Sequence, residues 1–121
     1  MEFNPLIPIW LQVETDIKLN MIRGTIAPGS KLPGGRDLAL QYTINPNTAA
    51  RVYQELEKEG LCQTRRGLGT FATDEPEKIR QVREDMAKNA IARFMAELKD
   101  LGYTKEEAIT LLIETEDTNH A

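Results

Sequence analysis

The chain has 121 residues, of which 40% are hydrophobic and 28% are charged, a balance typical of one small globular domain with or without an appendage. No apolar run approaches the roughly 18 residues that a membrane-spanning helix needs, and the first ten residues do not resemble a secretory signal. The single cysteine cannot form a disulfide within the chain. We therefore expect a cytoplasmic protein without a membrane partner.

The net charge of −4 is distributed unevenly along the chain. Residues 1–73 carry eight basic and seven acidic side chains, a net charge of +1. Residues 74–121 carry seven basic and twelve acidic side chains, a net charge of −5. The weakly positive first segment permits nucleic-acid binding without requiring it, and the asymmetry separates two segments of different character.

The first segment is expected to begin with an extended arm, because prolines stand at positions 5 and 8. A helix should follow, since apolar residues recur at helical spacing as far as Gly24: Ile9, Val13, Ile17 and Met21. The stretch APGSKLP, residues 27–33, is rich in turn-forming residues and predicts a connector.

Two helices joined by a short turn are predicted next, near 35–42 and 46–59. Asn45 suits the N-cap of the second helix and Pro46 its first position. This spacing is that of a helix-turn-helix. The glycine pair of LPGGRD, residues 32–37, lies between helices and matches no nucleotide-binding motif. It therefore indicates a helix start with Gly34 as the N-cap.

The residues 61–73, LCQTRRGLGTFAT, predict a β-hairpin, because two strand-like runs flank a turn that contains glycines. A long apolar helical stripe follows and ends at Gly102. Thr104 and Glu107 form a capping box that predicts the start of a last helix, and residues 116–121 are expected to be a frayed tail.

The chain offers few groups for catalysis or metal binding. Its one histidine, His120, stands next to the C-terminus and is expected to be solvated. Cys62 is expected to be a small buried hydrophobe. One histidine and one cysteine cannot make the usual zinc site within one chain. We therefore expect no enzymatic activity, no metal and no cofactor.

A polar surface is expected at the start of the second helix of the helix-turn-helix. Asn47, Thr48 and Arg51 should lie there, away from the apolar stripe of the helix. The first turns of a recognition helix enter the major groove, where Arg can bind guanine through two hydrogen bonds. The same residues could also form a merely solvated helix face. Glu55, one turn after Arg51, could pair with it in the free protein.

The neighbouring hairpin favours the DNA-binding interpretation. Arg65 and Arg66 stand at its turn, where glycines allow close approach to a DNA backbone. A helix-turn-helix followed by a hairpin is a winged helix. We therefore expect a mainly α fold with a small β-hairpin, with a winged helix-turn-helix over 1–73 and a two-helix segment over 74–121. Because winged helices also bind proteins or RNA, an interaction module without operator specificity remains the alternative.

The stretches PIWLQVETDIKLNMIRGTIAPGSKLPGGRDLA, INPNTAARVYQELEKEGL and RRGLGTF resemble, in this order, the N-terminal domain of GntR-family bacterial transcription regulators. The match covers roughly residues 8–71, and NPNT with the short tail resembles the YtrA-type subfamily. The resemblance implies a winged-helix transcription regulator of the repressor kind that binds double-stranded operator DNA. It maps the DNA contacts onto Arg36, Asn45, Asn47, Thr48, Arg51, Arg65, Arg66, Gly67 and Gly69.

Three positions depart from the family pattern. Gly34 replaces the usual serine, Ala50 stands where the subfamily often has a longer polar residue, and Leu68 replaces a basic residue at the tip of the wing. The last two changes each remove a potential DNA contact, so the resemblance implies a weaker wing than in relatives.

The C-terminal helices, near 76–101 and 104–116, carry an apolar stripe that is too wide for one helix to bury alone. We expect them to pair with a second copy in a homodimer, with folding back onto their own winged helix as the alternative. A twofold dimer predicts a palindromic operator. The sequence identifies no small-molecule effector. The residues expected at the dimer surface are Ile79, Val82, Met86, Ile91, Phe94, Leu98, Leu101, Ile109 and Leu112.

Overall fold

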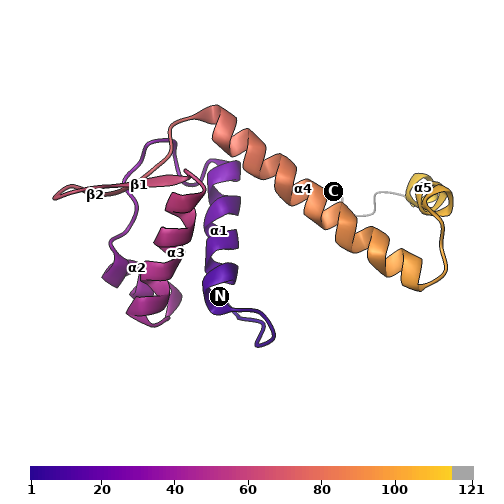
Figure 1. Cartoon of the computed structure of the whole chain (residues 1–121), viewed down its shortest axis with the longest axis horizontal. Coiled ribbons are helices and arrows are strands. Elements are labelled where there is room, and N and C mark those ends of the chain that lie inside the picture. Colours follow the sequence, from indigo (N-terminus) through magenta and orange to yellow (C-terminus); the bar gives the residue numbers. More distant parts are fainter. Residues whose placement is uncertain (116–121) are drawn as a thin grey trace. The chain divides into compact units, whose positions relative to one another are not determined.

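In the computed structural model, the described residues 1–115 form five helices and one antiparallel hairpin (Figure 1). The expected mainly α fold with a small hairpin is thus confirmed. The tail that was expected to fray, including His120, lies outside the described residues. The elements are α1 (Ile9–Arg23), α2 (Gly35–Tyr42), α3 (Pro46–Lys58), β1 (Cys62–Arg65), β2 (Gly69–Ala72), α4 (Pro76–Asp100) and α5 (Lys105–Glu114).

The chain divides into two compact units, residues 1–83 and 84–121. The division falls inside α4, where Ile79 and Val82 are half-buried against the core of the first unit. The first unit therefore contains the helix-turn-helix, the hairpin and the first turns of α4. No helix among the described residues is long and apolar enough to cross a membrane.

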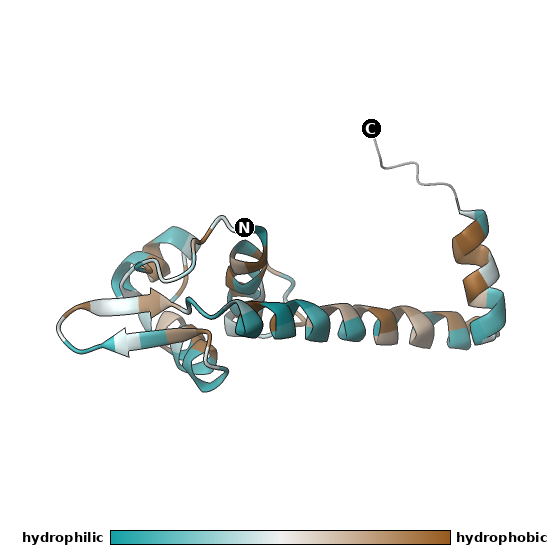
Figure 2. Cartoon of the chain, turned by 90° about the horizontal axis from the view of Figure 1, so that it is seen from above, coloured by the Kyte–Doolittle hydropathy of each residue, from teal (hydrophilic) through white to brown (hydrophobic). Residues whose placement is uncertain are grey.

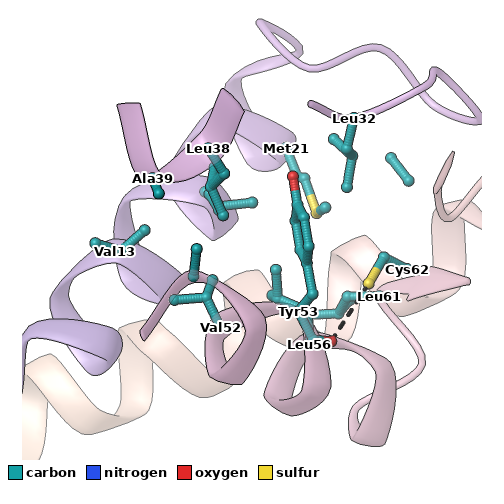
Figure 3. Close-up of a cluster of buried hydrophobic side chains, with 13 residues drawn as sticks. Val13, Met21, Leu32, Leu38, Ala39, Val52, Tyr53, Leu56, Leu61 and Cys62 are labelled. Carbon is teal, nitrogen blue, oxygen red and sulfur yellow. Dashed lines mark hydrogen bonds between the residues drawn. The ribbon is translucent and has the colours of Figure 1, made fainter. Parts of the chain in front are cut away.

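The first unit is built around α3, which packs against α1, α2 and β1. Its inner stripe is formed by Ala49, Val52, Tyr53 and Leu56. Val52 and Leu56 are fully inaccessible to solvent, as is Val13 of α1. Figure 3 shows these side chains meeting others from α2, from the connector before it and from the start of the hairpin. This burial fixes which face of α3 is left to solvent.

Two tyrosine hydroxyls tie the elements of the helix-turn-helix together. Tyr42, at the end of α2, donates to Asp16 Oδ2 of α1 at 2.6 Å. Tyr53 of α3 donates to the carbonyl of Pro33 in the connector. Burial raises the pKa of both hydroxyls, and Asp16 adds to the shift at Tyr42. Both groups therefore remain protonated donors at neutral pH.

The N-terminal arm is not extended, contrary to the expectation from its prolines. The amide of Ile7 donates to the carbonyl of Asn4 at 3.2 Å, which closes a turn. The Gln12 side chain accepts from the amide of Asn4 at 2.9 Å and donates to the carbonyls of Asn4 and Ile7 at 2.8 Å each. A glutamine in α1 thus folds the arm back, which the composition of the arm alone could not indicate.

The hairpin pairs Cys62 with Ala72 and Arg65 with Gly69 at its two ends. The connector that precedes α2 adds a third segment at its edge, which the sequence did not predict. Lys31 forms an isolated antiparallel bridge with Phe71. The amide of Leu32 donates to the Thr70 carbonyl at 2.7 Å, and that of Ala72 to the Ser30 carbonyl at 2.8 Å.

The second unit contains the remainder of α4 and the whole of α5. The chain turns at Gly102, whose φ of 88° lies in the left-handed region that favours glycine. The expected capping box is confirmed: Thr104 Oγ1 accepts from the amide of Glu107 at 3.1 Å, and Glu107 Oε1 accepts from that of Thr104 at 3.0 Å. The start of α5 is therefore fixed by local hydrogen bonds.

A charged cluster joins α1 to the C-terminal end of α3. Lys18 Nζ lies 2.6 Å from Glu14 Oε1 and 2.9 Å from Glu59 Oε1. Glu14 is only 4% exposed, and its Oε2 has no hydrogen-bond partner. Burial raises the pKa of Glu14 above its ordinary value of 4.5; the bond to Lys18 opposes this shift and the neighbouring Glu59 adds to it. Burial of the Glu14 carboxylate therefore carries a net cost.

We predict that Glu14→Gln changes the pH dependence of the free energy of unfolding. The pKa of Glu14 in the folded chain lies above its unfolded value near 4.5. The stability that this carboxyl group contributes is therefore fully present below the unfolded pKa. That contribution is lost as the pH rises through the folded pKa, so the wild type should lose stability relative to the variant over this range. Urea unfolding between about pH 4 and about pH 8 measures the difference.

The exposed Glu2 provides a matched control. Glu2→Gln should leave the pH profile of the wild type unchanged, because this side chain stays exposed to solvent in the folded chain. Parallel profiles for the wild type and Glu14→Gln would contradict the assignment of a raised pKa to Glu14.

Candidate nucleic-acid interface

The start of α3 is fixed by its N-cap. Asn45 Oδ1 accepts a hydrogen bond from the amide of Asn47 at 2.7 Å, and Pro46 occupies the first helical position, as expected. The side chain of Asn47 is exposed, whereas Thr48 is half-buried at the margin of the packed face. Because the cap occupies Oδ1 of Asn45, its side-chain NH2 is the group left to donate to a nucleic acid.

The exposed face of α3 extends further along the helix than expected from the sequence. Ala50 and Gln54 are exposed together with Asn47 and Arg51, opposite the buried stripe. Gln54 was not among the expected contacts, although its spacing of three from Arg51 places it on the same side of the helix. A glutamine amide can bind adenine through two hydrogen bonds, and the methyl group of an alanine can contact that of thymine.

Arg51 stacks on an aromatic ring of α1. Its Cζ lies 4.4 Å from the centroid of the Trp10 ring, near the start of α1. Glu55, which could have paired with Arg51, lies 3.2 Å from Nζ of Lys58 through its Oε1. A planar guanidinium suits this stacked position, because it is more weakly hydrated than an ammonium group. The orientation of Arg51 thus depends on α1 as well as on α3.

The LPGGRD stretch begins α2, as expected. Gly34 is the N-cap with an extended backbone, φ −62° and ψ 164°, and it offers no side chain to cap the helix. Its carbonyl accepts from the amide of Leu38 at 2.8 Å. Arg36 is exposed in the first turn, beside Asp37. A helix start with exposed amides and an arginine is suited to a phosphate.

The turn of the hairpin brings the expected wing residues together. The amide of Leu68 donates to the carbonyl of Arg65 at 2.9 Å and closes the turn. Gly67 and Gly69 adopt φ values of 78° and 120°, which L-residues rarely adopt. The Arg65 guanidinium lies 4.7 Å from the centroid of the Phe71 ring, and Arg66 is exposed on the turn. One arginine is therefore held against the hairpin while the other extends from its tip.

Cys62 lies where the hairpin leaves the core and is 5% exposed. Its Sγ lies 3.7 Å from the carbonyl oxygen of Tyr53, to which it can donate (Figure 3). Burial raises the pKa of the thiol to about 12, and Glu57 adds to the shift. The expectation of a buried hydrophobe is confirmed, because a thiol with this pKa is not a reactive thiolate at neutral pH.

Comparison with known proteins agrees with this geometry. The family model described as bacterial regulatory proteins, gntR family, matches residues 10–72, which contain the helix-turn-helix and both strands of the hairpin. The chain belongs to the gntR family. Its members are transcription regulators that bind DNA through this domain, and they are not enzymes.

Two relatives from Bacillus subtilis illustrate the relationship. The chain is 37% identical over 108 residues to the uncharacterised HTH-type transcriptional regulator YhcF, covering 89% of each chain. It is 42% identical over 67 residues to the HTH-type transcriptional repressor YtrA, covering 55% of this chain and 52% of YtrA. These similarities confirm the expected YtrA type within the gntR family.

Two solved structures of the family resemble the chain to different extents. A GntR family transcriptional regulator from Listeria monocytogenes is 34% identical and has a TM-score of 0.84. The match covers 94% of this chain and the whole of the Listeria chain. The DNA-binding domain of AraR in complex with operator ORX1 is 27% identical, covers 60% of this chain over 93% of its own length and has a TM-score of 0.56.

We predict that Arg51→Met changes the fluorescence of Trp10, which is the only tryptophan of the chain. Loss of the guanidinium leaves one face of the indole less shielded, so the emission maximum should shift to longer wavelength. The free energy of unfolding should fall by about 0.5–1 kcal/mol, the usual contribution of an exposed cation–π contact. Emission spectra and urea unfolding measure the two effects.

Arg36→Met serves as the control, because it removes another exposed arginine that has no recorded ring contact. An emission spectrum of Arg51→Met that coincides with the spectra of Arg36→Met and the wild type would show that the stacked arrangement is not populated.

Proposed function

We propose that the chain is a sequence-specific repressor that acts in the cytoplasm and binds a palindromic double-stranded operator as a homodimer. The observation that supports this proposal most is the capped, solvent-exposed N-terminal half of α3, which belongs to the same compact unit as an arginine-bearing hairpin. The similarity to YtrA, a transcriptional repressor, and to the AraR domain in its operator complex supports it further.

In this proposal the contacts have two roles. Residues at the N-cap and in the first turns of α3 read bases in the major groove, where amides and guanidinium groups can form two hydrogen bonds with one base edge. Residues at the start of α2 and on the hairpin bind phosphates and fix the register without selecting a sequence. The first group is Asn45, Asn47, Thr48 and Arg51, and the second is Arg36, Arg65, Arg66 and the backbone at Gly67 and Gly69.

The proposed dimer surface is the apolar face of the second unit. Hydrophobic residues of α4 and α5 are visible as brown segments in Figure 2, and several are exposed in the single chain. Ile91, Leu101 and Leu112 are 61%, 71% and 58% exposed. Exposed apolar residues gathered on one unit are typical of a protein interface. The proposed surface consists of Met86, Ile91, Phe94, Leu98, Leu101, Ile109 and Leu112.

The proposed dimer surface does not include Ile79 and Val82, which were expected there from the sequence. Both are half-buried against the core of the first unit, so they already have apolar neighbours within their own chain. In functional terms we propose a DNA-binding segment over 1–73 and a dimerisation segment over 74–121, with the first turns of α4 packed on the DNA-binding unit.

The weak net charge of the DNA-binding segment favours DNA binding by two copies together. With a charge of +1 over residues 1–73, one copy offers few phosphate contacts. Two copies on half-sites about one helical turn apart, roughly 34 Å, combine these contacts, and binding should weaken steeply with salt.

Selection of duplexes from a random pool tests the proposed function. Enrichment of a palindrome supports an operator-binding dimer. No enrichment by a chain that retains its circular dichroism spectrum would overturn the proposal in favour of a protein- or RNA-interaction module.

We predict that Arg51→Ala weakens binding of the selected operator by about 1–3 kcal/mol and relaxes the sequence preference, as expected for a base-reading residue. Arg66→Ala and Arg36→Ala should weaken binding to all sequences alike, as expected for phosphate contacts. Titrations of operator and random duplexes, followed by mobility shift, distinguish the two patterns.

Arg23→Ala, at the end of α1, is the control for removal of an exposed positive charge. Operator affinity of Arg51→Ala equal to that of this control would show that Arg51 does not contact the bases.

We predict that the wild-type chain sediments with the mass of two copies at micromolar concentration and that Leu112→Glu sediments as one. A glutamate in an apolar interface cannot be solvated without opening it. Leu68→Glu replaces a leucine of similar exposure, 62% against 58%, on the hairpin turn and should remain dimeric. A monomeric wild type, or a Leu112→Glu variant that remains dimeric, would contradict the proposed surface.

A further inference from the structure

Lys31 lies on the outer face of the hairpin. Its bridge with Phe71 makes residues 30–32 a third segment of the small sheet. Paired residues of neighbouring strands project to the same face, so Lys31 shares its face with Phe71. Arg65 lies on this face as well, two residues beyond the β1 residue that pairs with Phe71. The opposite face carries the buried Cys62 and Ala72. Lys31 is therefore on the solvent side, and it is exposed.

The Lys31 side chain passes directly over Gly69. A Cβ atom on Gly69 would lie 2.7 Å from Cε of Lys31 and 3.5 Å from its Nζ. The first of these distances is shorter than real Cβ contacts allow. The absence of a side chain at Gly69 thus provides the path along which the lysine reaches the turn. This path brings the ammonium group beside the residue that follows Leu68 at the tip of the hairpin.

The ammonium group of Lys31 is available for an external anion. Lys18, Lys58, Lys78 and Lys88 each lie within ion-pair distance of a glutamate. None of the ion pairs recorded among the described residues involves Lys31. A lysine ammonium group beside Gly69, on the same face as Arg65, adds positive potential at the end of the hairpin, where Leu68 carries no charge.

We propose that Lys31 is a phosphate-binding residue of the wing and supplies the positive charge that the hairpin turn lacks at Leu68. The inference rests on the proposed operator-binding function and adds to it a contact from outside the hairpin sequence. An ammonium group binds a phosphate as a point charge without reading the base, so Lys31 contributes equally to all sequences.

Lys31→Met tests the proposal, because methionine retains an unbranched side chain and removes the charge. Affinity should fall roughly fivefold for both operator and random duplexes at low salt, and the slope of log K against log salt should decrease by about 0.9 for each lost phosphate contact. Lys31→Arg should restore both the affinity and the slope. Fluorescence anisotropy of labelled duplexes at several salt concentrations measures them.

Lys88→Met removes the same charge from the second unit and should behave as the wild type. Equal affinity and slope for Lys31→Met and Lys88→Met would overturn the inference, as would a loss confined to the operator sequence. Thermal unfolding of Lys31→Met, with Lys31→Gln as a second variant, separates lost binding from lost folding. A wild-type chain that binds no duplex would overturn the operator-binding function itself, whereas normal wild-type binding with an unaffected Lys31→Met would overturn only this inference.

Discussion

The structure of the first unit depends on the burial of one face of α3. Val52 and Leu56 are fully enclosed by neighbouring elements, and full burial of such aliphatic side chains contributes about 1.5–3 kcal/mol each. Because α3 cannot rotate without exposing this stripe, its opposite face is fixed toward solvent. Display of Asn47, Arg51 and Gln54 is thus a consequence of core packing. The Asn45 cap then fixes where the helix begins.

Features that depend on neighbours in the sequence were predicted well. The caps at Asn45 and Thr104 require only residues two or three positions away, and both were found as expected. The hairpin was also predictable, because its turn glycines and strand-like runs are contiguous. Contacts between distant segments were not predictable: the bridge of Lys31 with Phe71 and the stacking of Arg51 on Trp10 join residues some forty positions apart. A short-range pattern contains no information about such pairs.

The division of the chain within α4 shows how one helix can serve two purposes. Its first turns contribute Ile79 and Val82 to the core of the first unit, while Ile91 farther along is largely exposed. The periodic apolar stripe looks continuous in the sequence, so periodicity alone assigns all of it to one surface. Burial separates the part that completes a core from the part that is left for a partner.

The position of Cys62 makes the attachment of the hairpin experimentally accessible. The thiol lies at the start of β1, buried, with its pKa raised by that burial. A thiol reagent can reach it only when the hairpin separates locally from the core, because the closed state hides the sulfur and disfavours the thiolate. As Cys62 is the only cysteine, the labelling rate of the native protein reports how often this segment opens. The same residue that completes the core is thus also an intrinsic probe of local unfolding at the base of the hairpin.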